Sequence, residues 1–480
     1  MSAGTQAAQF PLQGAAASRP EIRTYVDPNI SNPLRKTIFY FSLIYIFIRF
    51  SMIHEAASEI LGLNLYLAYI FGLPSILGVL VTGGFIRLSG HRLVRSWILF
   101  GVLILIATVF STWRGGSVEM LITYFKSEWT MLFVVAGLAM TWREVKALHT
   151  VMLLSGVMSL IIARLLMRTS DYSGRFELNI SGGSIANSND LAGHLLMLMP
   201  FYLYAVVKSG QNFLMRLFCL GASAYSIYVI LGAGSRGAMI GLIVVGVGFF
   251  FLSSSATKMA LMIVLPVAGI LTFAILPSSV QQRLTNFDTQ VETENQVSGD
   301  AAGSLTERKR LFQSSIYYTI TNPIFGVGPG MFAVYDDKQQ RGMGLPRGSW
   351  HNTHNVYTQI SSECGIPAFL CYVFTLFGSF LLARKLYTQT ANQPDMKDIQ
   401  DIASGLLLSL SGFLVAIFFL TIGYRFQIGA MAGLAIVTSI IGQQEYSRRL
   451  ALRKAAAPTE APPSLTPLGA RLLKQARSSR

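Results

Sequence analysis

Two histidines in a polar stretch of a very apolar chain are the residues best suited to acid–base chemistry. His351 and His354 lie three residues apart within residues 322–368. An imidazole titrates near neutral pH, so it can act as a general base or donate a hydrogen bond to a phosphate. The neighbouring Asn355 has an amide side chain that could orient either ring. The alternative is that His354 is exposed to water or makes a structural hydrogen bond.

Metal binding is the other chemistry that two closely spaced histidines suggest. No cysteine and no obvious third ligand accompanies them, and Cys219, Cys364 and Cys371 show no metal-ligand spacing. We therefore expect no metal site at these histidines.

Arg236 lies in a short Gly-Ser-Arg-Gly turn, residues 234–237, between two apolar runs. An arginine at a membrane boundary often extends its side chain to the lipid headgroups. However, an ionisable residue beside a span is also a functional candidate, and a guanidinium binds phosphate through paired hydrogen bonds. A phosphate clamp and a headgroup contact are therefore the two alternatives for Arg236.

Residues 305–320 have the periodicity of an amphipathic helix whose apolar face is formed by Leu305, Phe312, Ile316 and Ile320. At about 100° per residue, Arg308 lies on the side of Phe312 and faces inward, whereas Arg310 points away. An inward-facing arginine needs a partner. We therefore favour Arg308 over Arg310 as the functional residue, with a solvated helix face as the alternative for both.

Composition places the chain among polytopic helical membrane proteins. Of its 480 residues, 52% are hydrophobic and 13% are charged, against about a quarter charged in soluble proteins. The apolar blocks of about 16–24 residues suit membrane-crossing helices and not the alternating strands of a barrel. We expect an all-α fold with about twelve spans, at residues 34–52, 65–85, 94–112, 117–140, 147–166, 190–207, 214–233, 237–252, 258–276, 366–383, 403–421 and 425–442.

Membrane topology explains the net charge of +15 better than nucleic-acid binding does. If the N-terminus is cytoplasmic, the predicted inner loops carry many of the lysines and arginines, and both termini lie inside. The predicted organisation is then a disordered cytoplasmic tail at 1–33, spans at 34–276, a large outer loop at 277–365, further spans at 366–442 and a basic cytoplasmic tail on membrane lipids at 443–480.

Basic residues on the outer side contradict this charge rule. A cluster of cations there can bind an anion, and phosphate is the natural candidate. Arg175 and Asn189, both in the outer segment 167–189, are further candidates for contact with that anion, although residues 187–190 are first expected to form a helix N-cap. The outer basic residues are Arg175, Arg236, Arg308, Lys309, Arg310, Lys338, Arg341, Arg347 and Arg425.

The glycine-rich run at 326–330 differs from a nucleotide-binding loop. It lacks the Walker spacing and its lysine, so nucleotide binding by that route is not expected. Contact between its backbone N–H groups and a phosphate remains open. Asn322 and Pro323 precede the run and should end the helix predicted at 305–320.

Four motifs together resemble the O-antigen ligase and O-antigen polymerase superfamily of bacterial membrane glycosyltransferases. His354 and Asn355, then nine residues, then Gly365 is similar to the ligase signature. That signature closes three residues later on Gly, Thr or Tyr, whereas this chain has Ala368. The superfamily also includes polymerases and protein O-oligosaccharyltransferases, which therefore stay as alternatives to a ligase.

The other three motifs lie upstream in the order that the superfamily shows. They are the Asn-Ser-Asn-Asp-Leu-Ala stretch at 187–192, the Ser-Arg-Gly turn at Arg236, and Arg308 followed by the Asn-Pro and Gly-x-Gly-x-Gly passage at 322–330. The resemblance covers residues 34–442 and leaves out the two tails.

The resemblance implies a GT-C-like glycosyltransferase in the bacterial inner membrane with its active site facing the periplasm. The donor would be a glycan on undecaprenyl pyrophosphate, and the acceptor a hydroxyl of lipid A-core, of another glycan or of a protein. The reaction would invert the anomeric centre and need no metal, nucleotide or other cofactor.

The resemblance also implies roles for the candidate residues. His354 would take the acceptor proton or bind phosphate, and Arg236 and Arg308 would neutralise the pyrophosphate as the glycosidic bond breaks. The predicted substrate-binding residues are Arg310, His351, Asn355, Arg175 and Asn189.

A transporter for a polar or anionic solute is the alternative from another class. Transporter sites lie near the bilayer midplane. Lys126 and Glu128, within the predicted span 117–140, are the candidate site residues, but they are better explained as a structural pair. The chain shows no obvious inverted repeat.

Overall fold

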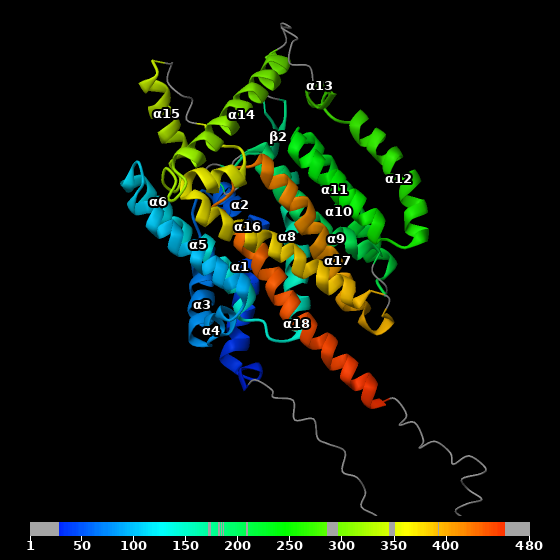
Figure 1. Ribbon diagram of the computed structural model, residues 1–480. Helices are drawn as coiled ribbons and strands as arrows, with labels where there is room; N and C mark the ends of the chain where they lie inside the picture. The colour runs from blue at the N-terminus through cyan, green and yellow to red at the C-terminus, as the bar shows by residue number, and fades with distance from the viewer. Residues whose placement is uncertain are drawn as a thin grey trace, which may run out of the picture.

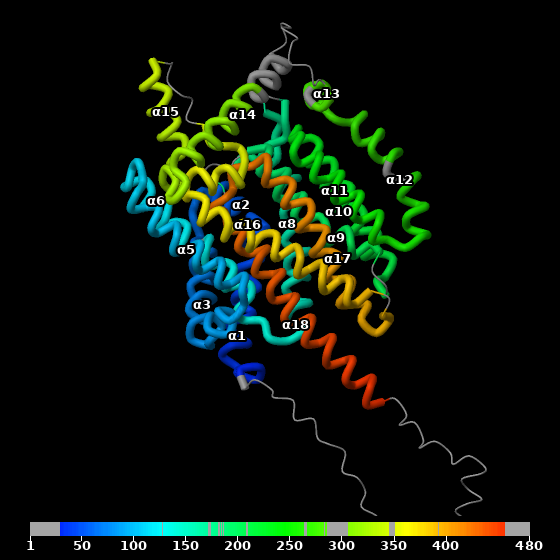
Figure 2. The backbone as a smooth tube through the Cα atoms, in the orientation of Figure 1, coloured from blue at the N-terminus to red at the C-terminus, as the bar shows by residue number. Residues whose placement is uncertain are grey.

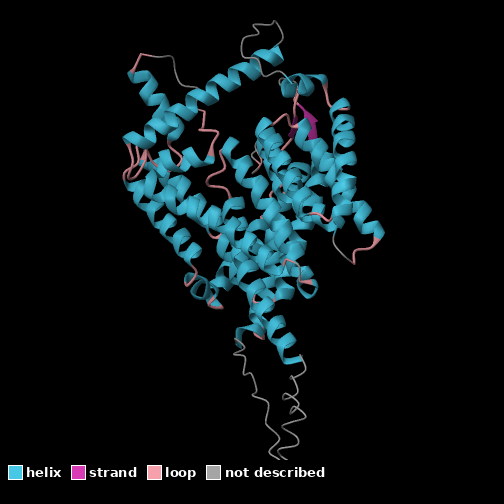
Figure 3. Ribbon diagram, turned by 45° about the vertical axis from the view of Figure 1, so that its right-hand side comes forward, coloured by secondary structure: helices cyan, strands magenta, loops and turns pink. Residues whose placement is uncertain are grey.

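The computed structural model describes residues 28–170, 174–180, 183, 185, 187–207, 210–285, 296–344, 351–391 and 393–456. Helices form almost all of this part of the chain (Figure 3). The strands within it are one antiparallel pair, β1 (Met167–Thr169) and β2 (Phe176–Leu178). The predicted all-α polytopic fold is confirmed.

The helices of the first half are α1 (Pro33–Ser51), α2 (Ile53–Leu61), α3 (Leu67–Val81), α4 (Gly84–Ser89), α5 (Arg92–Val109), α6 (Arg114–Thr123), the π-helical turn η2 (Tyr124–Trp129), α7 (Met131–Gly137), α8 (Trp142–Leu166), α9 (Ser188–Val207) and α10 (Phe213–Gly232). Those of the second half are α11 (Arg236–Leu252), α12 (Ser255–Ala274), α13 (Ser278–Thr285), α14 (Gln296–Thr321), α15 (Phe332–Gly342), α16 (Val356–Thr390), α17 (Lys397–Ala416) and α18 (Phe426–Ala456). Short 3-10 turns occur at η1 (Pro28–Ile30), η3 (Pro394–Met396) and η4 (Ile417–Phe419).

Among the described residues, eight helices are long and apolar enough to cross a membrane, or nine when α1 and α2, which meet at a bend of 65°, form one span. α3 and α11 are shorter apolar helices. Each predicted apolar range coincides with one or more helices, with the range 117–140 divided among α6, η2 and α7. The multi-pass architecture is confirmed, whereas a total of twelve spans stays a prediction.

Several helix boundaries differ from those expected. α16 begins at Val356 rather than at 366, because the helix runs on through a break at Gly365. α14 begins at Gln296, before the predicted 305, and ends at Thr321 ahead of the Asn-Pro pair, as predicted. α18 continues to Ala456 instead of ending near 442. Most of the two predicted tails, residues 1–27 and 457–480, lies outside the described residues.

The two ends of the helical bundle carry different elements (Figure 1). α13, α14 and α15 lie at one end, and the start of α1 and the end of α18 lie at the opposite end. α12 lies at the edge of the bundle beyond α11 (Figure 2). This arrangement is the one expected if the segment 277–365 and both termini lie on opposite sides of a membrane.

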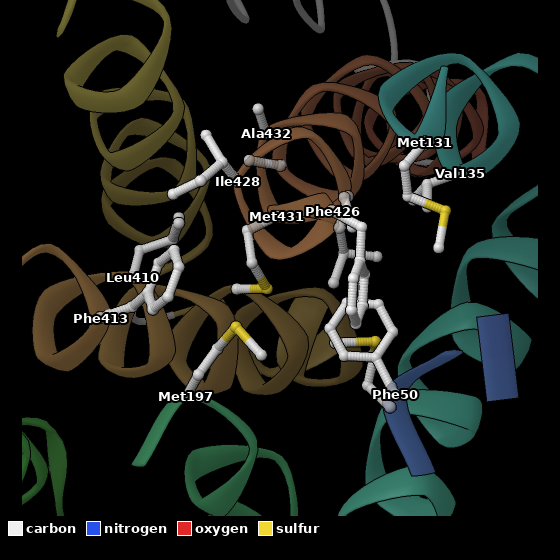
Figure 4. Packing of buried hydrophobic residues seen from close by; sticks show 14 of the residues in the cluster. Phe50, Met131, Val135, Met197, Leu410, Phe413, Phe426, Ile428, Met431 and Ala432 are labelled. Carbon is white, nitrogen blue, oxygen red and sulfur yellow. The ribbon is translucent and has the colours of Figure 1, made fainter. Parts of the chain in front are cut away.

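α18 lies in the centre of the bundle, and its small residues allow close contact with α7. A Cβ at Gly433 would lie 2.6 Å from the carbonyl oxygen of Leu132, so only glycine permits this approach. At the start of α18, Phe426 packs edge-on against Phe50 with ring centroids 5.0 Å apart, and Met431 lies in the same core (Figure 4). The first half of α18 is thus packed on several sides, and this packing fixes the end of the segment 417–425 that leads into it.

The predicted pairing of Lys126 with Glu128 is wrong. Glu128 forms an ion pair with Arg49 of α1 at 3.0 Å, and Lys126 donates to the hydroxyl of Tyr69 on α3 at 2.8 Å. Residues two apart on a helical turn do not face each other, so the two side chains contact different helices.

Candidate functional site

His354 lies on a turn immediately before α16 and is oriented by its backbone. Its φ of 50° is uncommon for a residue with a side chain. Its N–H donates to Oγ1 of Thr421 at 3.1 Å. Asn355 then caps α16, its Oδ1 accepting from the N–H groups of Tyr357 and Thr358 at 2.9 and 3.1 Å. Asn355, predicted to bind substrate, is therefore buried and uses its carbonyl oxygen in the cap.

Residues 417–425, between α17 and α18, join the elements that carry the predicted site. The ring of Phe418 lies 6.2 Å from that of Tyr357 on α16 and 6.2 Å from that of Phe312 on α14. Phe312 follows Arg308 by one helical turn. The segment that holds the histidine turn therefore also contacts the helix that carries Arg308.

Arg236 begins α11 beside the same segment, and Ser235 supplies the side-chain cap of this helix. A Cβ at Gly237 would lie 2.4 Å from Cγ of Phe419, so glycine lets α11 pack directly on residues 417–425. Arg236 is half-buried in this position. Arg236, Arg308 and the histidine turn thus all belong to elements that meet at 417–425.

Arg175 and Asn189, both predicted to bind substrate, contact each other. Nη2 of Arg175 donates to Oδ1 of Asn189, and Nε donates to the carbonyl oxygen of Ala233, each at 2.7 Å. The side chain of Asn187 accepts from the first N–H groups of α9, so the predicted N-cap is confirmed. Because Ala233 precedes Arg236 closely, Arg175 supports the turn that presents Arg236.

The surroundings of His354 favour its neutral form. Burial is the main cause, and the positive charges of Arg308 and His351 add to it, so the pKa of His354 falls from 6.5 to about 4. The rings of His351 and His354 lie 6.5 Å apart, and Nδ1 of the exposed His351 is 3.6 Å from a carboxylate oxygen of Glu307. His354 therefore keeps a lone pair at neutral pH, close enough to Arg308 for its charge to matter.

Arg310 is held in ion pairs that join α14 to α15. Its guanidinium lies 2.7 Å from Glu307 and 3.0 Å from Asp336, and Asp336 also accepts from the hydroxyl of Tyr318 at 2.8 Å. The hydrogen bonds to Glu307, followed by the charge of Asp336, raise the pKa of Arg310. Arg310, predicted to bind substrate, thus has a structural task in this arrangement.

The predicted buried face of α14 is wrong. Ile316 is 40% exposed and Ile320 is 69% exposed, whereas Leu311 and Ser315 are fully buried. The helix packs on α16 and on the start of α15, and hydrophobic periodicity alone does not identify that side.

The N–H groups of the glycine-rich run at 326–330 all have partners within the protein. Those of residues 326, 327 and 328 bond to the carbonyl oxygens of Asn322, Ser362 and Glu363 at 3.0, 2.9 and 3.0 Å. That of Gly330 bonds to the carboxylate of Glu363 at 3.0 Å, and proline at 329 has none. The phosphate cradle left open by the sequence is therefore not formed by these groups.

Glu363 of α16 was not among the residues predicted from the sequence. Its side chain is 1% exposed, and its two oxygens accept from the N–H groups of Gly330 and Phe332 at 3.0 and 3.2 Å. A carboxylate just before Gly365, at the edge of an apolar run, was the available signal, because a buried charge requires partners.

The remaining basic residues predicted on the outer side differ in exposure and in their contacts. Lys309 and Lys338 are exposed, Arg425 is half-buried at the end of the 417–425 segment, and Arg347 lies outside the described residues. Arg341 is in an ion pair within α15. In the described ranges, no group of three or more His, Cys, Asp or Glu residues is arranged to hold a metal ion.

Chemically, the site combines an imidazole with a lone pair and two half-buried guanidinium groups. Guanidinium groups bind and neutralise phosphate-type anions, and a neutral imidazole accepts a proton from a hydroxyl. This combination suits transfer of a group from a phosphate leaving group to an oxygen nucleophile.

Comparison with known families agrees with this chemistry. Residues 221–373 match the family model described as O-antigen ligase. The matched stretch runs from α10 into α16 and includes Arg236, Arg308 and His354. No curated protein gives a significant match to the chain.

Proposed function

We propose that the chain is a ligase-type glycosyltransferase of the O-antigen ligase and polymerase superfamily, a proposal supported by the family match at residues 221–373. It moves a glycan from undecaprenyl pyrophosphate to an acceptor hydroxyl. The observation that carries this proposal is the neutral His354 beside the charge of Arg308, at the segment where α11 presents Arg236.

In the proposed reaction, the imidazole of His354 accepts the proton of the acceptor hydroxyl. The oxygen attacks the anomeric carbon, and the bond from that carbon to the phosphate oxygen breaks. The electron pair leaves with the undecaprenyl pyrophosphate, and in-line attack inverts the anomeric centre. Arg236 and Arg308 neutralise the negative charge that grows on the leaving group.

A second role for His354 is a hydrogen bond to the pyrophosphate, with the acceptor losing its proton to water. The lowered pKa of His354 supports the first role, since the ring is already unprotonated at neutral pH. The anionic donor would also raise that pKa while bound, which makes the imidazole a better base at the moment of attack.

The proposed site faces the periplasm of a bacterial inner membrane. Arg448, Arg449, Arg453 and Lys454 lie at the end of α18, which is opposite to the end with α14 and α15 (Figure 1). Positive charge concentrates on the cytoplasmic side, so the end with α14 is assigned to the periplasm.

Polymerase activity is the alternative within the superfamily, and lipid A-core, another glycan or a protein are the candidate acceptors. Transport has less support, because Glu128 is paired with Arg49 and Lys126 contacts Tyr69. The two residues therefore do not form a joint solute site.

The test uses the purified full-length protein in nanodiscs with an undecaprenyl-pyrophosphate-linked glycan. Transfer to added lipid A-core would support the ligase, whereas a ladder from donor alone would support the polymerase. Lys309→Ala is the matched control for Arg308→Ala, because Lys309 is the exposed neighbouring cation. Equal activity of Arg308→Ala and Lys309→Ala would contradict the proposed site.

A further inference from the structure

α16 is interrupted near its start, and the backbone groups released there hold the loop at 323–332. Gly365 has φ 83° and ψ 171°. Pro367 has no N–H, so the carbonyl oxygen of Glu363 lacks the partner that a continuous helix would supply. That oxygen accepts instead from the N–H of Gly328 at 3.0 Å.

The two backbones meet so closely that side chains are excluded between them. A Cβ at Gly326 would lie 2.3 Å from the carbonyl carbon of Glu363, and one at Gly365 would lie 2.2 Å from the carbonyl oxygen of Ile324. The N–H of Ile366 donates to the carbonyl oxygen of Pro323 at 2.7 Å. These backbone contacts fix one end of the loop.

The carboxylate of Glu363 fixes the other end of the loop. Each oxygen accepts one N–H, those of Gly330 and Phe332, at 3.0 and 3.2 Å. Phe332 begins α15, so Glu363 determines where α15 starts.

α15 also holds α14, which packs directly on α16 as well. Phe332 packs with Leu311 and Tyr318 of α14 in a small buried cluster. Asp336 of α15 accepts from Arg310 at 3.0 Å and from the hydroxyl of Tyr318 at 2.8 Å. A shift of α15 would therefore move the helix that carries Arg308.

We propose that Glu363 is a positioning residue that sets the placement of Arg308 relative to His354. Glu363 lies on the helix that begins beside His354, and its carboxylate holds the elements that brace α14. The proposal rests on the roles proposed for His354 and Arg308, but the geometry itself can be measured without any substrate.

The test measures carbethoxylation of His354 by diethylpyrocarbonate in the full-length protein in nanodiscs without donor, quantified by mass spectrometry. Only the neutral ring reacts, so the ratio of the rates at pH 5 and pH 8 reports the protonation of His354. Arg308→Ala should lower this ratio about twofold, because it removes the nearby positive charge, and Glu363→Ala should lower it by a similar factor, because it lets that charge move away from His354. The double variant should show no further fall.

Glu144→Ala is the matched control. Oε2 of Glu144 also accepts from two backbone N–H groups, those of Met140 and Thr141 at 2.8 and 3.0 Å, but it caps α8 far from the site along the chain. If Glu363→Ala does not accumulate, Glu363→Gln, which keeps one acceptor oxygen, should give a smaller fall in the same ratio.

Three results would overturn the proposal. They are an unchanged ratio in the Glu363 variants, an equal fall in Glu144→Ala, and a fall caused by Glu363→Ala that persists in the Arg308→Ala background. Because no donor is present, absence of glycan transfer by the wild-type protein would count against the proposed function and not against this placement.

Discussion

The backbone N–H of His354 donates to Oγ1 of Thr421 at 3.1 Å, across 67 positions of the chain. This bond holds a histidine whose φ of 50° is uncommon for a non-glycine residue. Thr421 lies in the segment between α17 and α18, which also contacts α11 and α14. The placement of His354 therefore depends on the packing of four helices and not on its own turn alone.

Thr421→Val should lower kcat about tenfold with little change in the yield of folded protein. Valine keeps the shape but removes the acceptor, so His354 loses the bond that selects its backbone conformation. Thr421→Ser keeps the hydroxyl and should retain most of the activity. Steady-state glycan transfer measures both, and equal loss in the two variants would point to packing rather than to this hydrogen bond.

His354→Ala should lower kcat by a factor of about 10² to 10⁴, the usual contribution of a general base. His354→Gln separates the two proposed roles, because glutamine can donate to a phosphate but cannot take the acceptor proton. Loss in both variants supports the base. Near-normal transfer by His354→Gln would instead make the residue a phosphate ligand.

The pH dependence of the reaction should show an acid limb at lower pH for kcat/KM than for kcat. In the free enzyme, burial and the charges of Arg308 and His351 lower the pKa of His354 to about 4, so the base stays unprotonated down to about pH 5. The bound pyrophosphate favours the protonated ring and raises this pKa, which moves the limb of kcat upward. An acid limb of kcat/KM near the ordinary histidine value of 6.5 would contradict the proposed environment.

Arg310→Met should lower the thermal unfolding temperature by several degrees while reducing transfer less than Arg308→Met does. Removing Arg310 leaves Asp336, whose side chain is 5% exposed, without its cationic partner. Arg308→Met should show the reverse, a large loss of kcat with little change in unfolding temperature. A thermal shift assay and the transfer assay on both variants check these opposite expectations.

Gly326→Ala should prevent accumulation of folded protein. Its Cβ would lie 2.3 Å from the backbone of Glu363, and its φ of 67° already disfavours alanine. Gly344→Ala is the matched control, because Gly344 has a similar φ of 72° with nothing within 4 Å of a Cβ. Equal expression of the two variants would show that the close contact with α16 is not needed for folding.

Local chemistry in the sequence was enough to predict much of the fold. Apolar runs long enough to cross a bilayer coincide with helices, and Asn187 caps α9 where its position before an apolar run predicted a cap. The choice of Arg308 over Arg310 agrees with the charge that Arg308 places on His354. However, the face of α14 used for that choice was wrong, because Ile316 and Ile320 are exposed.

The features that could be predicted from the sequence lie within a few neighbouring residues: the apolar runs, the helix caps, the Asn-Pro stop and the motif around His354. Contacts between groups far apart in the chain, such as Glu363 with the N–H of Gly330 or Gly237 with Phe419, are visible only in the folded protein. The physical reason is that these contacts depend on how whole helices pack, and no local periodicity encodes the partner. A carboxylate in an apolar run indicates that hydrogen-bond donors must lie near it. Only the folded structure shows which groups these donors are.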